Sequence, residues 1–239
     1  MRLLLIAAIL PLAACQSSWE KEGQAAEVRG SGATRSFAAS GFTGIALQGS
    51  DDVDVKIGAT FSVTAEGAPE TLDQLDIRIV DGTLRVGRKQ SEGKEVDDDK
   101  GARVHVVMPR LTSASVGGSG DLSVDKAEGE FSGAVAGSGN LRIGQLSAGA
   151  ATLSVAGSGD LNVSGTTSKL SASIAGSGDI DAKGLTATSA DISIAGSGNL
   201  SGTVRGPASI SILGSGDVEL GGGARCSTSA LGTGEARCS

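Results

Sequence analysis

The chain has 239 residues, of which 39% are hydrophobic, only 2% are aromatic and 38 are glycine. A core of this composition has to be built from Val, Ile, Leu and Ala, which suit closely stacked strands. The formal charge of −7 and the isoelectric point near 4.8 argue against nucleic acid or an anionic membrane surface as a partner, because both require basic patches.

The N-terminus carries the sharpest short motif. Met1-Arg2 supplies a positive start, Leu3–Leu10 an apolar stretch, and Leu12-Ala13-Ala14-Cys15 a small-residue cleavage site. The apolar stretch is too short to cross about 30 Å of hydrocarbon as a helix, which favours a signal that is removed. The motif resembles the lipobox of bacterial lipoproteins, which implies a signal peptide over 1–14 and acylation of Cys15 with chains such as palmitate. An ordinary secretory signal, in which Cys15 has no role, is the alternative.

The segment 15–35 is expected to tether the protein to the membrane. It is polar, rich in glycine and without periodicity, so its composition favours a flexible coil. Two acyl chains suffice for stable anchoring, because each buried methylene contributes about 0.8 kcal/mol. Gln16 follows the cysteine, and by resemblance to Gram-negative lipoproteins a residue other than Asp implies the outer membrane, provided that the source is Gram-negative.

Alternation of apolar and polar residues predicts strands in the section 36–116. The run 75–86 predicts a hairpin, because Asp81-Gly82 accepts the positive φ values of a two-residue turn. No stretch shows a helical period of useful length. The other clear strands are expected at 42–47, 53–57 and 61–65.

Arg88–Gly101 has almost no apolar residues and is predicted to be an exposed loop. Asp97-Asp98-Asp99 within it could attract calcium, but the usual calcium loop alternates its ligands around a turn glycine. A solvated run of charges is the preferred interpretation.

A tetrad of the form Gly-Ser-Gly-Asp/Asn recurs in the section 117–239 and decides the expected fold. Its steps are 19, 20, 19, 20 and 18 residues, and a degenerate seventh copy, Gly232-Thr233-Gly234-Glu235, follows 18 residues later. Gly49-Ser50-Asp51 is a candidate early copy. The six tetrads begin at Gly118, Gly137, Gly157, Gly176, Gly196 and Gly214.

Each repeat predicts two short strands that meet at a glycine corner, because the flanks of the tetrads alternate in the same phase. One such unit cannot bury its apolar side chains, whereas stacked units form continuous ladders of Val, Ile, Leu and Ala. The sequence therefore predicts an all-β fold, a parallel β-solenoid with about 19 residues per coil. Seven coils at ~4.8 Å would span on the order of 30 Å.

The fourth tetrad position is predicted to form a column along one edge of the rod. Asp and Asn bond neighbouring backbone groups at tight corners, which is the preferred role. Calcium is the alternative, but solenoid repeats that bind calcium use a nine-residue period, so no metal or other cofactor is expected. The column comprises Asp121, Asn140, Asp160, Asp179, Asn199, Asp217 and Glu235.

Cys226 and Cys238 fall in the last repeat, at positions that align with the inward-facing Ala208 and Leu220. Once Cys15 is acylated, they form an even pair in a compartment that permits disulfides. We predict a disulfide that stabilises the last coil by about 2 to 3 kcal/mol in the entropic model. Two buried free thiols are the alternative.

The order of these features resembles the bacterial family labelled putative auto-transporter adhesin, head GIN domain. The resemblance rests on the lipoprotein signal, the opening strand at Phe37 and Phe42, a β segment ending in Met108-Pro109-Arg110-Leu111, and the successive tetrads. It covers roughly Phe37–Leu220 and implies a right-handed parallel β-helix within one domain, 36–239. No binding residue of the family can be carried over.

Catalysis has little support in the sequence. His105 is the only histidine and lies in an alternating strand, so a Ser-His-Asp arrangement would rest on one residue without a nucleophile motif. The tetrads lack the lysine and the helix of a phosphate loop, which argues against nucleotide binding. We expect no catalytic residues.

The expected function is that of an envelope-anchored, non-catalytic binding module that adheres to glycans or proteins through flat faces rich in Ser and Thr. A periplasm-facing scaffold that self-associates is the alternative, and a polysaccharide-active β-helix enzyme is a distant third. The shortage of aromatic residues disfavours a lectin that stacks sugars on rings.

Overall fold

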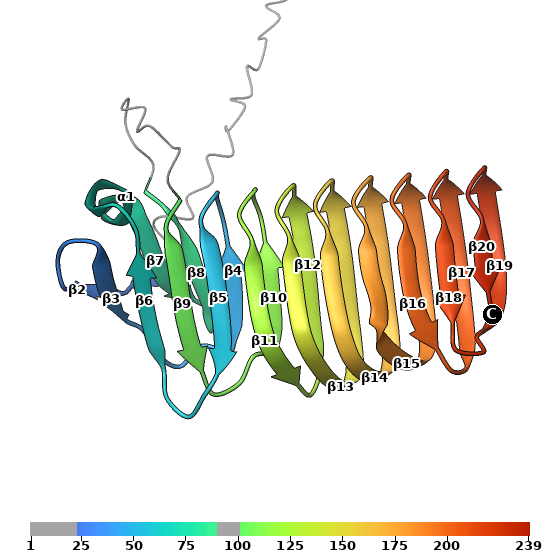
Figure 1. The fold of residues 1–239 in the computed structure, drawn as a ribbon, viewed down its shortest axis with the longest axis horizontal. Helices are drawn as coiled ribbons and strands as arrows, with labels where there is room; N and C mark the ends of the chain where they lie inside the picture. The colour runs from blue at the N-terminus through green and yellow to red at the C-terminus, as the bar shows by residue number, and fades with distance from the viewer. Residues whose placement is uncertain (1–22, 90–100) are drawn as a thin grey trace, which may run out of the picture.

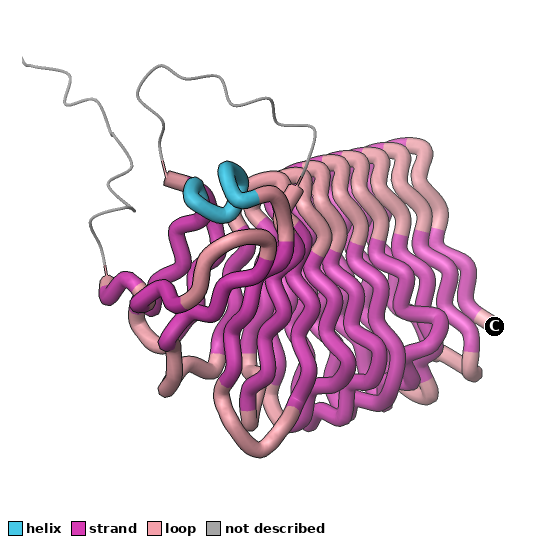
Figure 2. The backbone as a smooth tube through the Cα atoms, turned by 60° about the vertical axis from the view of Figure 1, so that its left-hand side comes forward, coloured by secondary structure: helices cyan, strands magenta, loops and turns pink. Residues whose placement is uncertain are grey.

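The computed structural model describes residues 23–89 and 101–239. In this part the chain forms the predicted parallel β-solenoid of about 19 residues per coil, drawn side-on in Figure 1. The strands of successive coils stack in register into three faces, named A, B and C below, and Figure 2 shows the coils obliquely.

Face A contains parallel strands except at its N-terminal end. Apolar residues alternate with small polar residues, so one side of each strand packs into the core and the other meets solvent. At the N-terminal end, β1 (Gln24–Ala25) pairs antiparallel with β7 (Leu75–Val80), which pairs antiparallel with β8. The parallel strands, in spatial order, are β8 (Thr83–Arg88), β4 (Gly44–Leu47), β10 (Ser113–Val116), β12 (Phe131–Gly137), the last parts of β13 (Leu141–Gly157), β14 (Leu161–Gly176) and β15 (Ile180–Gly196), then β17 (Pro207–Gly214) and β19 (Arg225–Gly232).

Face B is built in the same way. Its N-terminal end consists of three antiparallel strands, β2 (Glu27–Arg29), β3 (Thr34–Ala38) and β6 (Ser62–Glu66), and β6 pairs with β9. The parallel strands follow as β9 (Arg103–Met108), β5 (Asp52–Ile57), β11 (Leu122–Glu128), the first parts of β13, β14 and β15, then β16 (Leu200–Val204), β18 (Val218–Gly221) and β20 (Ala236–Cys238).

Face C is shorter, and the prediction of two strands per coil missed it. It begins at Lys126–Glu128 of β11 and continues through 145–147, 165–167, 185–187 and 203–204. The register shifts where faces B and C meet, for example between Ile143 and Leu146. Such an irregularity breaks the two-residue alternation, so the third strand has no clear signal in the sequence.

The N-terminal section both continues the solenoid and closes its end. β4 and β5 form a coil whose corner stacks on the first regular tetrad, since the Gly49 carbonyl accepts the N–H groups of Ser119 and Gly120. The candidate early tetrad is therefore confirmed. β8 and β9 lie outside this coil although they follow it in the chain, because β4 is paired with both β8 and β10. The predicted hairpin is confirmed by the pairing of β7 with β8.

A six-residue helix, α1 (Pro69–Gln74), packs Leu72 into the N-terminal end of the core. No helical period predicted it, because six residues are too few to display one. Arg35 of β3 donates a hydrogen bond to the Asp73 carboxylate at 2.5 Å. This bond holds the pKa of Asp73 below its ordinary value.

Two predicted boundaries were wrong. The segment 15–35 is not a coil throughout, because β1, β2 and the start of β3 are ordered by antiparallel pairing with neighbouring strands. The loop predicted at Arg88–Gly101 does not include Arg88, which ends β8 and is part-buried in an ion pair. The signal peptide, Cys15 and Asp97-Asp98-Asp99 lie outside the described residues.

The glycine corners explain why the tetrad repeats. Gly137 has φ +140°, and a Cβ atom at Gly137 or Gly139 would overlap a carbonyl oxygen of the corner below. The overlap would be with Gly118 O for Gly137 and with Gly120 O for Gly139. The Gly118 carbonyl also accepts the N–H groups of Ser138 at 3.0 Å and Gly139 at 2.8 Å. Both glycines are therefore required for one corner to lie directly on the next.

A buried ion pair replaces the corner where the regular stack ends. Asp51 occupies the place of the second tetrad glycine and is fully buried. Its carboxylate accepts bonds from Arg88 Nε and Nη2 at 3.0 and 2.8 Å and from the Ala102 N–H at 2.8 Å. The pair joins β8, the β4/β5 corner and the start of β9, which are distant in sequence.

Cys226 and Cys238 are joined by a disulfide in the structure. They stack on Ala208 and Leu220, as the sequence alignment placed them. The bridge connects β19 of face A to β20 of face B and closes the last coil at the C-terminal end of the solenoid, where Cys226 is half-buried and Cys238 is exposed.

We expect Gly159→Ala to destabilise the solenoid, because the new Cβ atom would overlap the Gly139 carbonyl oxygen. Forcing an atom into such a site costs about 1–3 kcal/mol. Gly149→Ala is the matched control, since nothing lies within 4 Å of a Cβ there, and it should change stability by less than about 0.5 kcal/mol. Urea unfolding followed by circular dichroism measures both, and equal stabilities for the two variants would contradict the stacking argument.

Candidate functional site

The column of Asp and Asn residues forms a continuous ladder along the edge between faces A and B. In each coil the Oδ1 atom accepts the backbone N–H of the column residue in the next coil. The first four bonds measure 3.0–3.2 Å and the last three 2.6–3.0 Å, and they link, in order, Asp52, Asp121, Asn140, Asp160, Asp179, Asn199, Asp217 and Glu235.

The two asparagines also donate side-chain hydrogen bonds within this ladder. Asn140 Nδ2 donates to Asp121 Oδ1 at 2.9 Å, and Asn199 Nδ2 donates to Asp179 Oδ1 at 3.1 Å. An amide that both accepts and donates separates neighbouring carboxylates, which would otherwise repel at one strand spacing. These bonds indicate that the ladder caps the corners by accepting their backbone N–H groups.

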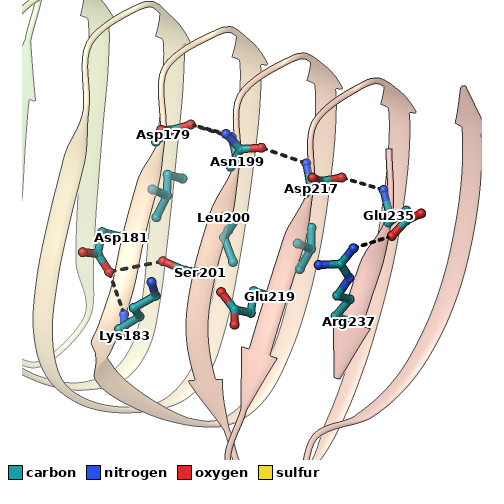
Figure 3. A pocket seen from close by; sticks show the side chains of 12 residues that line it. Asp179, Asp181, Lys183, Asn199, Leu200, Ser201, Asp217, Glu219, Glu235 and Arg237 are labelled. Carbon is teal, nitrogen blue, oxygen red and sulfur yellow. Dashed lines mark hydrogen bonds and ion pairs between the residues drawn. The ribbon is translucent and has the colours of Figure 1, made fainter. Parts of the chain in front are cut away.

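A groove runs beside the ladder on the solvent side of face B. Its part over the coils of β15, β16, β18 and β20 has a volume of about 530 Å³. Figure 3 shows the side chains that line this part. A second depression of about 210 Å³ shares Asp181 and Lys183 with it and extends toward Arg142. The groove thus follows the axis of the rod across several coils.

Charged and polar side chains from successive coils line the groove. Asp181 accepts bonds from Ser201 Oγ at 3.2 Å and from the Lys183 backbone N–H at 3.1 Å. Arg237 pairs with Glu235 at 2.9 Å (Figure 3). The five carboxylates of the lining outnumber its two cations; they belong to Asp179, Asp181, Asp217, Glu219 and Glu235, against Lys183 and Arg237.

Two of these groups are free to meet a ligand. In the part of the chain that the structure describes, the Lys183 ammonium and the Glu219 carboxylate form neither an ion pair nor a hydrogen bond, and Glu219 is exposed. Lys183 offers three donors and Glu219 four acceptor sites. The groove therefore offers both signs of charge, with an excess of acceptors.

From β10 to β19, face A presents a different surface, on which only Lys169, Asp191 and Arg225 are charged. The outward row directly before the tetrad glycine changes from Ala to Leu at the C-terminal end. Leu213 and Leu231 of this row are 56% and 72% exposed. Asp191, paired with Lys169, is the only charged residue in the two inner rows. These rows are Ser113, Ser132, Thr152, Ser171, Asp191, Ser209, Ser227 and Ser115, Ala134, Ser154, Ser173, Ser193, Ser211, Ser229.

The structure offers no metal cluster over residues 23–89 and 101–239, where no group of three His, Cys, Asp or Glu side chains is placed to hold an ion. His105 lies in the outward row of β9, with Nδ1 3.5 Å from Asp54 Oδ2. Arg103 pairs with Asp54 and with Asp52, both at 3.2 Å. This is a surface charge cluster, and among the described hydrogen bonds none links His105 to a hydroxyl group that could act as a nucleophile.

The family model described as "Putative auto-transporter adhesin, head GIN domain" matches residues 41–224. The chain belongs to this family. No curated protein matches the chain.

Solved structures share the head GIN fold at low identity. A putative adhesin from Bacteroides fragilis NCTC 9343 has a TM-score of 0.77 at 18% identity, over 86% of this chain and 96% of that one. A putative lipid binding protein from Parabacteroides distasonis ATCC 8503 has a TM-score of 0.69 at 22% identity, over 89% and 98%. A putative adhesin from Parabacteroides merdae ATCC 43184 reaches 0.64 at 20%, over 87% and 97%.

Family membership indicates a binding role at the cell surface or envelope, and the solved neighbours support the fold. The one helix in the described part of the head GIN chain is too short and polar to cross a membrane.

The sequence placed the column residues in one line, and the structure stacks all seven of them. The sequence-based prediction missed Asp52, because the early corner has the sequence Gly-Ser-Asp-Asp and lies 69 residues before Gly118. It also missed Lys183, Glu219 and Arg237 of the groove. The alternation of the strands could have predicted them, since they occupy outward positions two or four residues after a column residue.

We expect Asp160→Ala to lower the free energy of unfolding by about 1 kcal/mol, because it leaves the Asp179 N–H without its 3.0 Å acceptor. Asp160→Asn keeps an Oδ1 acceptor and should stay within about 0.5 kcal/mol of the wild type. Urea unfolding distinguishes the two outcomes. Calcium should leave all three midpoints unchanged, because backbone N–H groups already occupy Oδ1; a calcium-dependent rise would favour a metal-binding column instead.

Proposed function

We propose that the protein is an envelope lipoprotein, anchored through acylated Cys15, whose solenoid is a non-catalytic module that binds glycans or proteins. The observation that carries this proposal is the groove along face B, about 530 Å³ over the coils of β15–β20. Each coil contributes one outward side chain to its floor, Asp181, Ser201, Glu219 and Arg237 in order, so the groove suits an extended ligand that meets several coils at once.

The chemistry of the groove points to recognition by hydrogen bonds and charge. Phe37, Phe42 and Phe131 are buried, and Phe61 is half-buried against Phe42 with ring centroids 4.9 Å apart. No aromatic ring in the described residues lines the groove, so sugars could not stack there. A ligand would instead place hydroxyl or amino groups against Asp181, Ser201 and Glu219.

The anchor is supported by the sequence. Leu12-Ala13-Ala14-Cys15 has the form of a lipobox, and Gln16 after the cysteine is compatible with the outer membrane of a Gram-negative cell. The N-terminal strands β1, β2 and β3 lie at one end of the rod, as Figure 1 shows. An anchor ahead of β1 would leave the groove coils β15–β20 distant from the attachment point.

Face A favours a second candidate function, an envelope scaffold that self-associates. Rows of Ser and Ala allow two sheets to approach closely, and exposed Leu213 and Leu231 add apolar area. The ladder gives no corresponding support to a polysaccharide-active enzyme, because the Oδ1 atom of each Asp already accepts a backbone N–H group.

The groove is tested by a glycan array and a binding assay on host and bacterial surface proteins, with purified protein. Lys183→Ala combined with Glu219→Ala should reduce any binding signal at least tenfold, because both free charges of the groove are lost. Ser173→Ala combined with Ser211→Ala on face A is the matched control and should bind as the wild type does. A loss confined to the face A variant would move the site there, and no binding at all would favour the scaffold.

Orientation and anchoring are tested by protease shaving of intact cells. The wild type should be cleaved while a periplasmic marker survives, and Cys15→Ala should leave the membrane fraction. Protection of the wild type would place the solenoid in the periplasm and favour the scaffold. Retention of Cys15→Ala in the membrane would rule out the lipid anchor.

A further inference from the structure

Face C begins at an unpaired strand edge that lies part-way along the solenoid and not at its end. Lys126–Glu128 of β11 pairs with 145–147 of β13 on one side, and on the other side the described part of the chain provides no strand. The cause is the path of the chain. After Ile57 the β4/β5 coil leaves the solenoid to form β6, and after Met108 the chain passes directly to β10. The two outer coils therefore contribute nothing to face C.

A cavity of about 380 Å³ occupies the position where the missing strand would lie. One wall is the strand edge of Lys126, Ala127 and Glu128, and the other is the connection Pro109–Leu111, with Ile57 between them. Leu111 and Ala127 are buried, at 1% exposure each. The apolar residues of the lining are thus Ile57, Leu111 and Ala127, and its charged residues are Arg110, Lys126 and Glu128.

Asp125 closes only one end of this edge. Its Oδ1 atom accepts the N–H groups of Lys126 at 2.6 Å and of Ile57 at 3.1 Å, as a backbone carbonyl of a neighbouring strand would. Beyond Lys126 the edge continues to Gly129 without such a substitute among the described residues. An unpaired edge of this kind is a template for an added strand.

The rim carries two unpaired positive charges. Arg110, Lys126 and Glu128 line it, and across the described residues the side chains of Arg110 and Lys126 form no ion pair or hydrogen bond, whereas the Asp125 carboxylate at its end is already bonded to two backbone N–H groups. On the strand Lys126 and Glu128 point outward while Ala127 points inward. A strand added here would place alternate side chains over Ile57 and Leu111 and the others beside Lys126 and Arg110.

We propose that Lys126–Glu128 binds an extended peptide segment of a partner protein as an added strand of face C. The segment alternates apolar residues, which enter the cavity, with acidic residues, which lie against Lys126 and Arg110. Main-chain hydrogen bonds provide the affinity and the two rows of side chains the specificity, as in other cases of strand addition. This site is separate from the groove on face B and does not depend on the function proposed for that groove.

The test is a fluorescence anisotropy titration of the purified protein with labelled hexapeptides. An alternating Asp-Val peptide should bind at least tenfold more tightly than an alternating Lys-Val peptide. The Asp-Val peptide with N-methylated backbone amides should also bind at least tenfold more weakly, because it lacks the donors of a strand. Equal binding of the N-methylated peptide, or no saturable binding by Asp-Val, would overturn the proposal.

Charge reversal at the rim locates the site. Arg110→Glu combined with Lys126→Glu should invert the preference, so that the Lys-Val peptide binds more tightly. Arg205→Glu combined with Arg225→Glu makes the same change in net charge at exposed positions elsewhere and should keep the wild-type order. An unchanged preference in the rim variant would overturn the proposal. So would dimerisation without peptide, detected by light scattering and lost in the rim variant, because it would assign the edge to a second copy.

Discussion

The structure depends on one repeated contact, in which a corner carbonyl accepts two N–H groups from the corner above. Gly118 does this for Ser138 and Gly139, and the same pair of bonds recurs at each later tetrad. The two corners can approach this closely only because the first and third residues of the upper corner are glycines. A Cβ atom on either glycine would overlap a carbonyl oxygen of the lower corner. The register of faces A and B follows from this contact, because each of their regular strands starts or ends at such a corner.

The same contact explains how the rod ends. Where the regular stack stops, the corner of β4/β5 has no glycine corner beneath it, and the buried Asp51 carboxylate fills the space with bonds to Arg88 and Ala102. Removing one partner of such a buried pair would leave an uncompensated charge, a cost of about 3–5 kcal/mol. Antiparallel strands and α1 then cover the edges that a bare solenoid would expose to aggregation.

Periodicity also determines what the surface can do. Equivalent positions of successive coils stack into a row along the rod. A residue type that recurs at one position therefore forms an extended surface. Face A repeats Ser and Ala and stays nearly uncharged, the edge ladder ties its own carboxylates to the backbone, and face B keeps the free charges of Lys183 and Glu219 beside a groove. The open edge of face C differs from all of these, because it arises where the repetition fails.

The tetrad spacing in the sequence determined the parallel solenoid, the length of its coil, the alignment of the column and the stacking of Cys226 and Cys238. These follow from local rules, since strand alternation and glycine corners act within one repeat and are copied by the next. The sequence could not determine the insertion of the β4/β5 coil between β8/β9 and β10/β11, the Asp51–Arg88 pair, the groove or the gap in face C. Each of these depends on which distant segments become neighbours, and only the packing of the whole chain decides that.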